Sequence, residues 1–220
     1  MIMYDYTMKQ KKVDMLSRSE LIRMAADDIK LCNLCSARLD AACPVPGKGN
    51  CEARVVILGR NPGAQENKLI EPFVGPAGKK LDEFLNIIEL SRQDVYITNL
   101  VKCYTKNNRE PQYDEIKTCR FLLDLEISII RPSLIIGLGE EACDSMVYCS
   151  SSSSRQKFFI VENKDIEIEY LFTPTRHPSA ALRNGRFNNE FLDDARWIKS
   201  FLNEANNNIP HHDLLTNILT

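Results

Sequence analysis

The chain has 220 residues, of which 44% are hydrophobic and 26% charged, which excludes a disordered protein and suits one α/β domain with a sizeable core. No apolar run approaches the roughly 20 residues that span a bilayer, and residues 1–12 lack the apolar stretch of a secretory signal, so we expect an intracellular protein without a membrane partner. The net charge of −2 excludes attraction of DNA by the whole molecule, and any such contact requires a local basic patch.

The first predicted elements follow a polar extension over residues 1–18. Ser17 and Glu20 form a capping box before apolar residues at helical spacing, which predicts a helix that leads to Cys32. Residues 54–58 form a nearly continuous apolar run, which predicts a buried strand.

Helices and strands alternate through the rest of a domain that we place at residues 19–204, before a tail over 205–220. The pattern predicts a helix, a strand, a helix and a strand over residues 81–88, 95–101, 113–130 and 134–138. It then predicts a short helix, two strands over 158–161 and 166–172, and a last helix over roughly 188–203. This order is typical of an α/β fold, here a three-layer α/β/α sandwich around a central, mainly parallel sheet.

Glycine-rich or polar segments follow four of the predicted strands. The segment Gly59–Gly63 leaves the first strand, and Asn99 lies late in the second. Gly139 ends the third, and His177 follows the last. Because ligands bind at the carboxyl ends of the strands in such a sheet, we expect these segments to converge on one cleft.

Four of the eight cysteines have a spacing typical of a metal site, with two residues between the first pair and fifteen between the second: Cys32, Cys35, Cys103 and Cys119. Four thiolates suit either an iron-sulfur cluster or zinc, and the spacing alone does not choose between them. The alternative is a set of buried thiols that fill the core. Cys43 and Cys51 are the replacements if one of the four is not a ligand, and Cys143 and Cys149 receive no chemistry.

Three further features each allow a functional and a structural interpretation. The tight turn at Gly59–Gly63 can present backbone N–H groups to an anion or carbonyl, or it is an ordinary turn. Phe73 lies in a second glycine-rich loop, where it either stacks on a base or packs in the core. His177 is either a polar contact to a ligand or a packed histidine.

The joint arrangement resembles the iron-sulfur uracil-DNA glycosylases known as family 4, over about residues 31–199. The matching blocks lie, in chain order, at residues 45–49, 59–63, 72–78, 95–103, 108–111 and 177–183. The resemblance implies a monofunctional hydrolase of base excision repair that cuts the N-glycosidic bond of a flipped-out uracil. It also implies uracil-containing DNA, single- or double-stranded, as the partner, and we expect a monomer.

The resemblance implies a role for each matching side chain. It places a 4Fe-4S cluster on the four cysteines named above, which favours iron over zinc. It implies that Phe73 stacks on the extruded base, that Asn99 bonds its polar edge and that His177 approaches uracil O2. Gly59 and Gly63 belong to the substrate-binding loop. We expect Ser179, Leu182 and Arg183 to contact DNA, with Leu182 as a wedge in the vacated stack and Arg183 as a local positive charge. Further positive charge near this loop comes from Arg176, Arg186 and Lys199.

The first glycine loop departs from the family pattern. Family members usually have Glu after the first glycine and a small residue next, whereas this chain has Arg60 and Asn61. The Gly-x-Asn-Pro-Gly form resembles the mismatch-specific and single-strand-selective branches of the same superfamily, where the asparagine positions the attacking water. We therefore expect Asn61 and His177 to be catalytic. Arg60 leaves two alternatives open, a glycosylase for another modified or mismatched base and a catalytically inactive DNA-binding member.

Overall fold

The computed structural model describes residues 16–147 and 153–208. Most of the predicted extension, Cys149 and most of the predicted tail therefore lie outside the described residues. None of the helices in the described part combines the length and apolar character that crossing a membrane requires. The division of the chain into extension, domain and tail stays a prediction.

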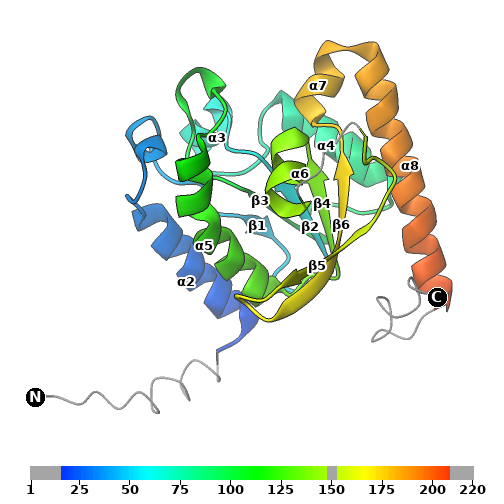
Figure 1. The fold of residues 1–220 in the computed structure, drawn as a ribbon, viewed down its shortest axis with the longest axis horizontal. Coiled ribbons are helices and arrows are strands. Elements are labelled where there is room, and N and C mark those ends of the chain that lie inside the picture. The colour runs from blue at the N-terminus through cyan, green and yellow to red at the C-terminus, as the bar shows by residue number, and fades with distance from the viewer. Residues whose placement is uncertain (1–15, 148–152, 209–220) are drawn as a thin grey trace, which may run out of the picture.

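A single six-stranded sheet forms the centre of the fold, in the order β1-β3-β2-β4-β6-β5 (Figure 1). The strands are β1 (Lys48–Gly49), β2 (Val55–Gly59), β3 (Val95–Asn99), β4 (Leu134–Leu138), β5 (Phe159–Asn163) and β6 (Ile168–Thr175). The four inner strands pair in parallel, and the two edge strands β1 and β5 pair antiparallel to their neighbours. The predicted mainly parallel sheet is confirmed.

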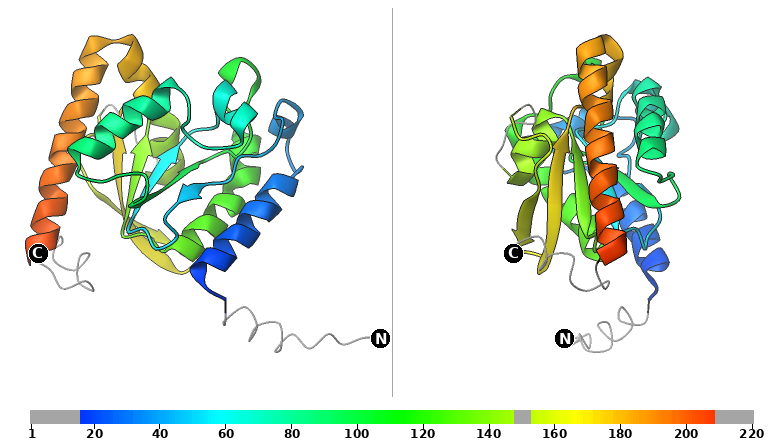
Figure 2. Two further views of the ribbon diagram at one scale, coloured as in Figure 1. Left: turned by 180° about the vertical axis from the view of Figure 1, so that it is seen from behind. Right: turned by 90° about the vertical axis from the view of Figure 1, so that its right-hand side faces the viewer.

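Helices cover both faces of the sheet, as the two further views show (Figure 2). The α-helices are α2 (Arg18–Leu31), α3 (Ala64–Leu69), α4 (Pro76–Ile87), α5 (Tyr113–Ile130), α6 (Glu140–Val147), α7 (Pro178–Arg183) and α8 (Gly185–Asn208). Two short 3-10 helices are η1 (Ser36–Leu39) and η2 (Lys106–Asn108). Helix α2 packs along α5, and α4 packs against α7 and α8.

Strand β2 shows how the sequence divides the core into two. Successive side chains of a strand point to opposite faces, so Val55 and Ile57 join the cluster under α4 and α8, whereas Val56 and Leu58 join the cluster under α5 and α6. All four side chains are buried. A fully apolar strand is what a sheet covered on both faces requires.

Several predicted element boundaries differ from the structure, two of them for identifiable local reasons. The second strand ends at Asn99 rather than at residue 101, because the buried Lys102 side chain donates back to the Asn99 carbonyl at 2.8 Å and turns the chain. The last helix begins at Gly185, because the Asn184 side chain accepts from the Arg186 N–H at 2.9 Å and caps it.

Candidate active site

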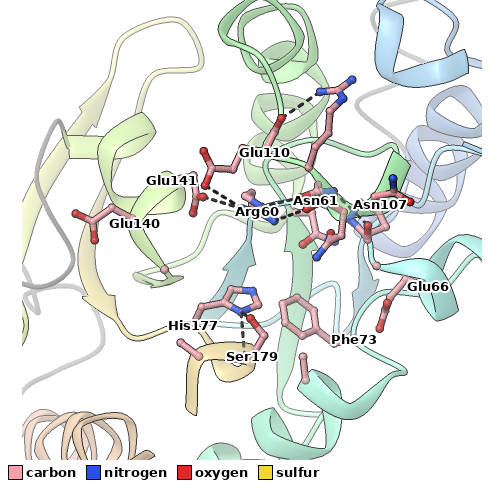
Figure 3. A pocket seen from close by; sticks show the side chains of 18 of the residues that line it. Arg60, Asn61, Glu66, Phe73, Asn107, Glu110, Glu140, Glu141, His177 and Ser179 are labelled. Atoms are coloured by element: carbon pink, nitrogen blue, oxygen red, sulfur yellow. Dashed lines mark hydrogen bonds and ion pairs between the residues drawn. The ribbon is translucent and has the colours of Figure 1, made fainter. Parts of the chain in front are cut away.

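The carboxyl ends of the parallel strands open into a cleft of about 700 Å³, a volume within the usual range for ligand pockets. Its walls come from the loops after β2, β3, β4 and β6 (Figure 3). Seven of the predicted site residues line it: Asn61, Gly63, Phe73, Asn99, His177, Ser179 and Arg183. The expected convergence of the strand ends on one cleft is therefore seen in the structure.

Two of the residues predicted to contact the substrate or the DNA lie outside the lining. Gly59 is the buried last residue of β2, and a Cβ added to it would lie 2.6 Å from Cζ of Phe73 and closer still to Oδ1 of Asn99. Gly59 is therefore the floor on which those two side chains pack, and only glycine fits there. Leu182 lies on α7 with 51% of its surface exposed, beside the cleft rather than in it.

Phe73 is held in an uncommon backbone conformation at the side of the cleft. Its φ is 53°, in the left-handed region that side chains other than glycine rarely adopt. The Arg92 guanidinium donates to the Phe73 carbonyl at 2.7 Å, and Arg92 is itself paired with Asp82 at 2.6 Å. These contacts fix the loop, so that the Phe73 ring lies with its centroid 6.3 Å from that of the His177 ring.

His177 is a neutral hydrogen-bond donor toward the cleft. Its Nδ1 accepts the Ser179 backbone N–H at 3.1 Å, and the Ser179 hydroxyl lies 2.7 Å from the same atom. Burial, assisted by the charge of Arg60, lowers the pKa of His177 to about 4. Because a backbone N–H always donates, the neutral ring keeps its proton on Nε2.

A chain of hydrogen bonds crosses the opposite side of the cleft. The Arg60 Nη1 atom donates to Glu141 Oε1 at 2.8 Å, and Arg60 Nε donates to Asn61 Oδ1 at 2.8 Å. Asn61 Nδ2 donates to Thr105 Oγ1 at 3.1 Å and to the Pro62 carbonyl at 3.2 Å. The Arg60 side chain is 19% exposed and that of Glu141 27%, so this chain lies at the cleft wall and not in the core.

Glu66 is a cleft residue that the sequence analysis missed. It lies in the first turn of α3, is 8% exposed, and its Oε1 accepts the Gly75 N–H at 2.8 Å. This bond ties the Gly59–Gly63 loop to the loop that carries Phe73. The signal in the sequence was a Glu three residues after Gly63, in a capping position, which becomes visible only once α3 is recognised as a helix.

Directly behind the cleft lies a buried polar network on β3 and α5. The Lys102 ammonium donates to Glu126 Oε2 at 2.6 Å and to Thr98 Oγ1 at 2.7 Å, and both charged side chains are 1% exposed. Glu126 also accepts from the Tyr96 hydroxyl at 3.1 Å and from the Gly47 N–H at 2.7 Å. Since Lys102 also bonds the Asn99 carbonyl, the network fixes the backbone that presents Asn99.

The four predicted metal ligands gather in a third cluster at one end of α2 and α5. Cys103 and Cys119 are buried in it, and Cys32 and Cys35 pack against it. Burial raises the pKa of Cys103 to about 12, and the neighbouring thiolates add to this effect. Burial likewise raises the pKa of Cys119 to about 11. In residues 16–147 and 153–208, no group of three or more His, Cys, Asp or Glu side chains is arranged so that it could hold a metal ion.

The buried carboxylate of Glu115 joins this cysteine segment to the cleft. It accepts two bonds from Arg109, at 2.7 and 2.8 Å, and one from the Ser36 hydroxyl at 2.7 Å. The bonds from Arg109 hold the pKa of Glu115 at about 2. Arg109 lines the cleft, and Ser36 directly follows Cys35.

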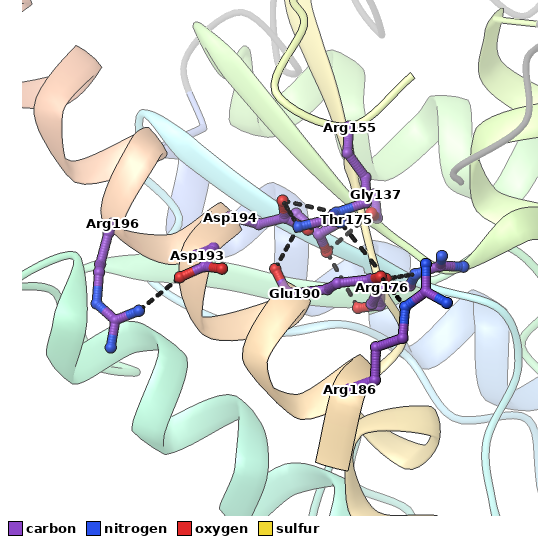
Figure 4. A network of polar contacts seen from close by, with 9 residues as sticks. All are labelled: Gly137, Arg155, Thr175, Arg176, Arg186, Glu190, Asp193, Asp194 and Arg196. Atoms are coloured by element: carbon purple, nitrogen blue, oxygen red, sulfur yellow. Dashed lines mark hydrogen bonds and ion pairs between the residues drawn. The ribbon is translucent and has the colours of Figure 1, made fainter. Parts of the chain in front are cut away.

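Three of the four basic residues expected near the His177 loop form ion pairs, and Figure 4 shows those of Arg176 and Arg186. Arg176 and Arg186 both pair with Glu190, at 2.7 and 3.0 Å. Arg155 pairs with Glu190 at 3.4 Å, and Lys199 pairs with Glu89 at 2.8 Å. The Arg186 side chain is nevertheless 81% exposed and that of Lys199 36% exposed, so the expected basic patch stays a prediction. Arg183, in contrast, is exposed and lines the cleft.

Comparison with known proteins agrees with this geometry. The model of the uracil DNA glycosylase superfamily matches residues 46–198. The type-4 uracil-DNA glycosylase of Saccharolobus solfataricus is 39% identical over 81% of this chain and 85% of its own length. That of Thermotoga maritima is 36% identical over 86% of this chain and 98% of its own length. That of Archaeoglobus fulgidus is 35% identical over 78% of this chain and 88% of its own length. The chain therefore belongs to the type-4 uracil-DNA glycosylase family.

Proposed function

We propose that this chain hydrolyses the N-glycosidic bond of uracil in DNA, after the nucleotide has flipped out of the stack, in base excision repair. The observation that supports this most is that Phe73, Asn99 and His177 line one cleft in a chain of this family. Phe73 comes from the loop between α3 and α4, Asn99 from the end of β3 and His177 from the segment after β6, and together they offer a stacking face, an amide and a neutral donor.

The base is recognised by Phe73 and Asn99. The Phe73 ring stacks on the pyrimidine, and the Asn99 amide accepts from uracil N3–H while it donates to O4. Cytosine reverses the donor and acceptor on that edge, so the amide rejects it. This role fits the rigid setting of Asn99, which is 2% exposed, above Gly59 and beside the buried Lys102.

The leaving group is stabilised by His177. As the bond between C1′ and N1 breaks, its electron pair moves into the base and negative charge gathers on uracil O2. A neutral imidazole with its proton on Nε2 donates a hydrogen bond to that oxygen. Because Ser179 occupies Nδ1, the ring cannot rotate to present the wrong nitrogen without losing two hydrogen bonds.

The attacking water is oriented by Asn61. Both N–H groups of its amide are engaged, with Thr105 and Pro62. The Oδ1 atom accepts one bond from Arg60 and, as a carbonyl oxygen, has a second lone pair. That lone pair accepts from the water, which then adds to C1′. A strong base is not required, because the departing uracil is a stabilised anion.

The decisive experiment is single-turnover excision from uracil-containing single-stranded DNA, followed by alkali to cut abasic sites. The wild type should release uracil, and Asn61→Ala and His177→Ala should each lower the rate by about 10² or more. Arg196→Ala, on the exposed face of α8, is the control that should retain the rate. Intact DNA after incubation with the wild type would contradict the proposal and favour an inactive DNA-binding protein. An unchanged rate for Asn61→Ala would remove Asn61 from the mechanism.

The base specificity follows from the same assay with other substrates. Hypoxanthine, thymine in G·T pairs and hydroxymethylated pyrimidines are compared with uracil at equal enzyme concentration. The Asn99 amide pairs equally well with the N3–H and O4 edge of thymine, so it is membership of the type-4 uracil-DNA glycosylase family that predicts the fastest excision for uracil. If another of these bases is excised faster, that base and not uracil is the preferred substrate.

The four clustered cysteines suit a 4Fe-4S cluster, the group that the family resemblance implies. The fit rests on the type of donor, four thiols that meet in the third cluster, and not on their arrangement, since no three of them are placed to hold a metal ion in the part of the chain that the structure describes. Cys32, Cys35, Cys103 and Cys119 would hold the group, which would cross-link the end of α2, the segment after β3 and helix α5.

Colour distinguishes iron-sulfur ligation from zinc. The purified protein should be brown and absorb near roughly 400 nm. Cys103→Ser should lose this absorption, whereas Cys51→Ser, which removes a thiol that packs against the α5 and α6 side of the sheet, should keep it. A colourless wild type with bound zinc would contradict the iron assignment.

DNA is held at the rim of the cleft by α7 and its neighbours. Arg183 is exposed there and neutralises a phosphate, and the segment at Ser179 contacts the DNA backbone. Leu182 presents its exposed side chain as the wedge that fills the vacated stack. Arg183→Ala should weaken binding and reduce the dependence of affinity on salt by about one counterion. An unchanged salt dependence would remove Arg183 from the interface.

A further inference from the structure

Arg60 occupies the position at which this chain departs from the family pattern, and its guanidinium contacts three segments of the cleft wall. It donates to the Glu141 carboxylate on α6, to the Asn61 amide on its own loop, and to the Asn108 carbonyl at 3.3 Å. Glu110 adds a longer ion pair at 3.8 Å. Figure 3 shows Arg60 between Glu141 and Asn61, on the side of the cleft away from Phe73 and His177.

The contact between Arg60 and Asn61 fixes which end of the amide faces which way. A guanidinium has five donors and no acceptor, so the atom of Asn61 that faces it must be the oxygen. The other end gives the same answer independently. The Thr105 hydroxyl donates to the Arg109 carbonyl at 2.5 Å and therefore accepts from Asn61, whose Nδ2 must lie on that side.

Glu141 in turn fixes Arg60. An arginine side chain has many rotamers, and holding one of them costs conformational entropy. The 2.8 Å bond to Glu141 Oε1 lies in a partly buried wall, where such a charged bond is stronger than in open solvent. The guanidinium is thus committed to Glu141, Asn61 and Asn108 together, a span that a single ammonium nitrogen cannot cover.

We propose that Arg60, anchored by Glu141, is a positioning residue that holds the Asn61 amide with its oxygen available to the attacking water. This inference rests on the proposed function and deepens it, because it names what sets the orientation of Asn61. Arg60 acts through Asn61 and contacts neither the base nor a phosphate.

A double-mutant cycle on single-turnover excision tests this. Arg60→Ala should lower the rate by roughly 10- to 100-fold, approaching the loss in Asn61→Ala, and the double variant should be no slower than Asn61→Ala within about threefold, since residues that act as one unit are not additive. Arg60→Lys should fail to restore the rate, and Glu141→Gln, which keeps an oxygen acceptor but loses the charge, should show a smaller loss. Affinity for uracil-containing DNA at several salt concentrations should stay unchanged in Arg60→Ala.

The other outcomes each decide against the inference. Additive losses in the double variant mean that Arg60 acts independently of Asn61. Restoration by Arg60→Lys, together with a reduced salt dependence of affinity in Arg60→Ala, means a phosphate contact. An Arg60→Ala rate equal to that of the wild type means no role. A wild type that leaves uracil in place overturns the proposed function itself, which separates that failure from the failure of this inference.

Discussion

Two ion pairs lie on either side of the Asn99 strand end, and they differ in almost every respect except charge. Lys102 and Glu126 are 1% exposed, and the carboxylate of Glu126 is saturated by donors from three other residues besides. Arg60 and Glu141 are 19% and 27% exposed and face the cleft. The buried pair holds backbone in place, whereas the cleft pair holds one side chain whose orientation matters for chemistry.

The two pairs should respond differently to the removal of one partner. A buried pair stabilises the fold only while both partners are present, because removal of one leaves a charge without water or counterion. A partly exposed pair can lose a partner to solvent at small cost. We therefore expect the buried pair to govern stability and the cleft pair to govern the rate of excision.

The sharpest way to break this comparison is Lys102→Met, which keeps the volume and removes the charge. Glu126 is then buried without its cation, and the free energy of unfolding should fall by about 3–5 kcal/mol. Urea denaturation measures it. Glu141→Gln is the matched variant of the cleft pair and should lose less than about 1 kcal/mol. Equal losses in the two variants would erase the distinction.

Gly59→Ala probes the floor between the two pairs. The added methyl would overlap the Phe73 ring, 2.6 Å from its Cζ, and the Asn99 amide. Overpacking of this kind should lower the free energy of unfolding by about 1–3 kcal/mol and should slow uracil excision, because both base-contacting side chains must shift. Gly185→Ala, where an added Cβ meets nothing within 4 Å, is the control. A wild-type rate of excision by Gly59→Ala would show that Phe73 and Asn99 can move to accommodate the added methyl group without loss of activity.

On the cleft side, the free energy of unfolding should depend on pH through His177. The folded-state pKa of His177 is about 4, below its ordinary value of 6.5, so the unfolded chain binds the proton first as the pH falls. The stability associated with a neutral His177 is therefore complete above about pH 6.5 and is lost between about pH 6.5 and 4.

At pH 5 the loss should be about 2 kcal/mol. It is measured as the stability of the wild type minus that of His177→Gln, at pH 7.5 and at pH 5. The other two histidines are present in both proteins and cancel. A difference that does not change with pH would mean that burial and the charges of Arg60 and Arg183 do not outweigh the opposing charge of Glu141 and do not hold the ring neutral.

The smallest effect belongs to a third pair, which extends the series to the surface. Arg196 and Asp193 lie 2.7 Å apart on α8 and are 63% and 56% exposed. Arg196→Ala should change the free energy of unfolding by no more than about 0.5 kcal/mol, measured by the same urea denaturation. A loss as large as that of Lys102→Met would show that exposure does not rank these pairs.

Features of the fold that depend on neighbouring residues could be predicted from the sequence, whereas those that depend on contacts between distant segments could not. The capping box at Ser17 and Glu20 is present as predicted, because both partners lie within one turn. The strands around β5 and β6 were expected, but their antiparallel pairing was not, since strand direction depends on where the chain returns. Asn184 was not recognised as the cap of α8, because the glycine that follows it, Gly185, is a poor helix former.

The cleft shows the same division. Asn61, Phe73, Asn99 and His177 were recognisable because each lies in a motif beside a strand end. Glu66, Glu141 and Lys102 were not, because their partners lie in other segments: Gly75, Arg60 and Glu126. The acidic partners of Arg176 and Lys199, on α8 and after α4, were likewise not visible in a charge count.

The Glu115 carboxylate links the segment of the predicted metal ligands to the cleft. One carboxylate takes bonds from Ser36, next to a predicted metal ligand, and from Arg109, which lines the cleft. A displacement of the Cys35 segment would therefore reach the cleft wall through Ser36, Glu115 and Arg109 in turn.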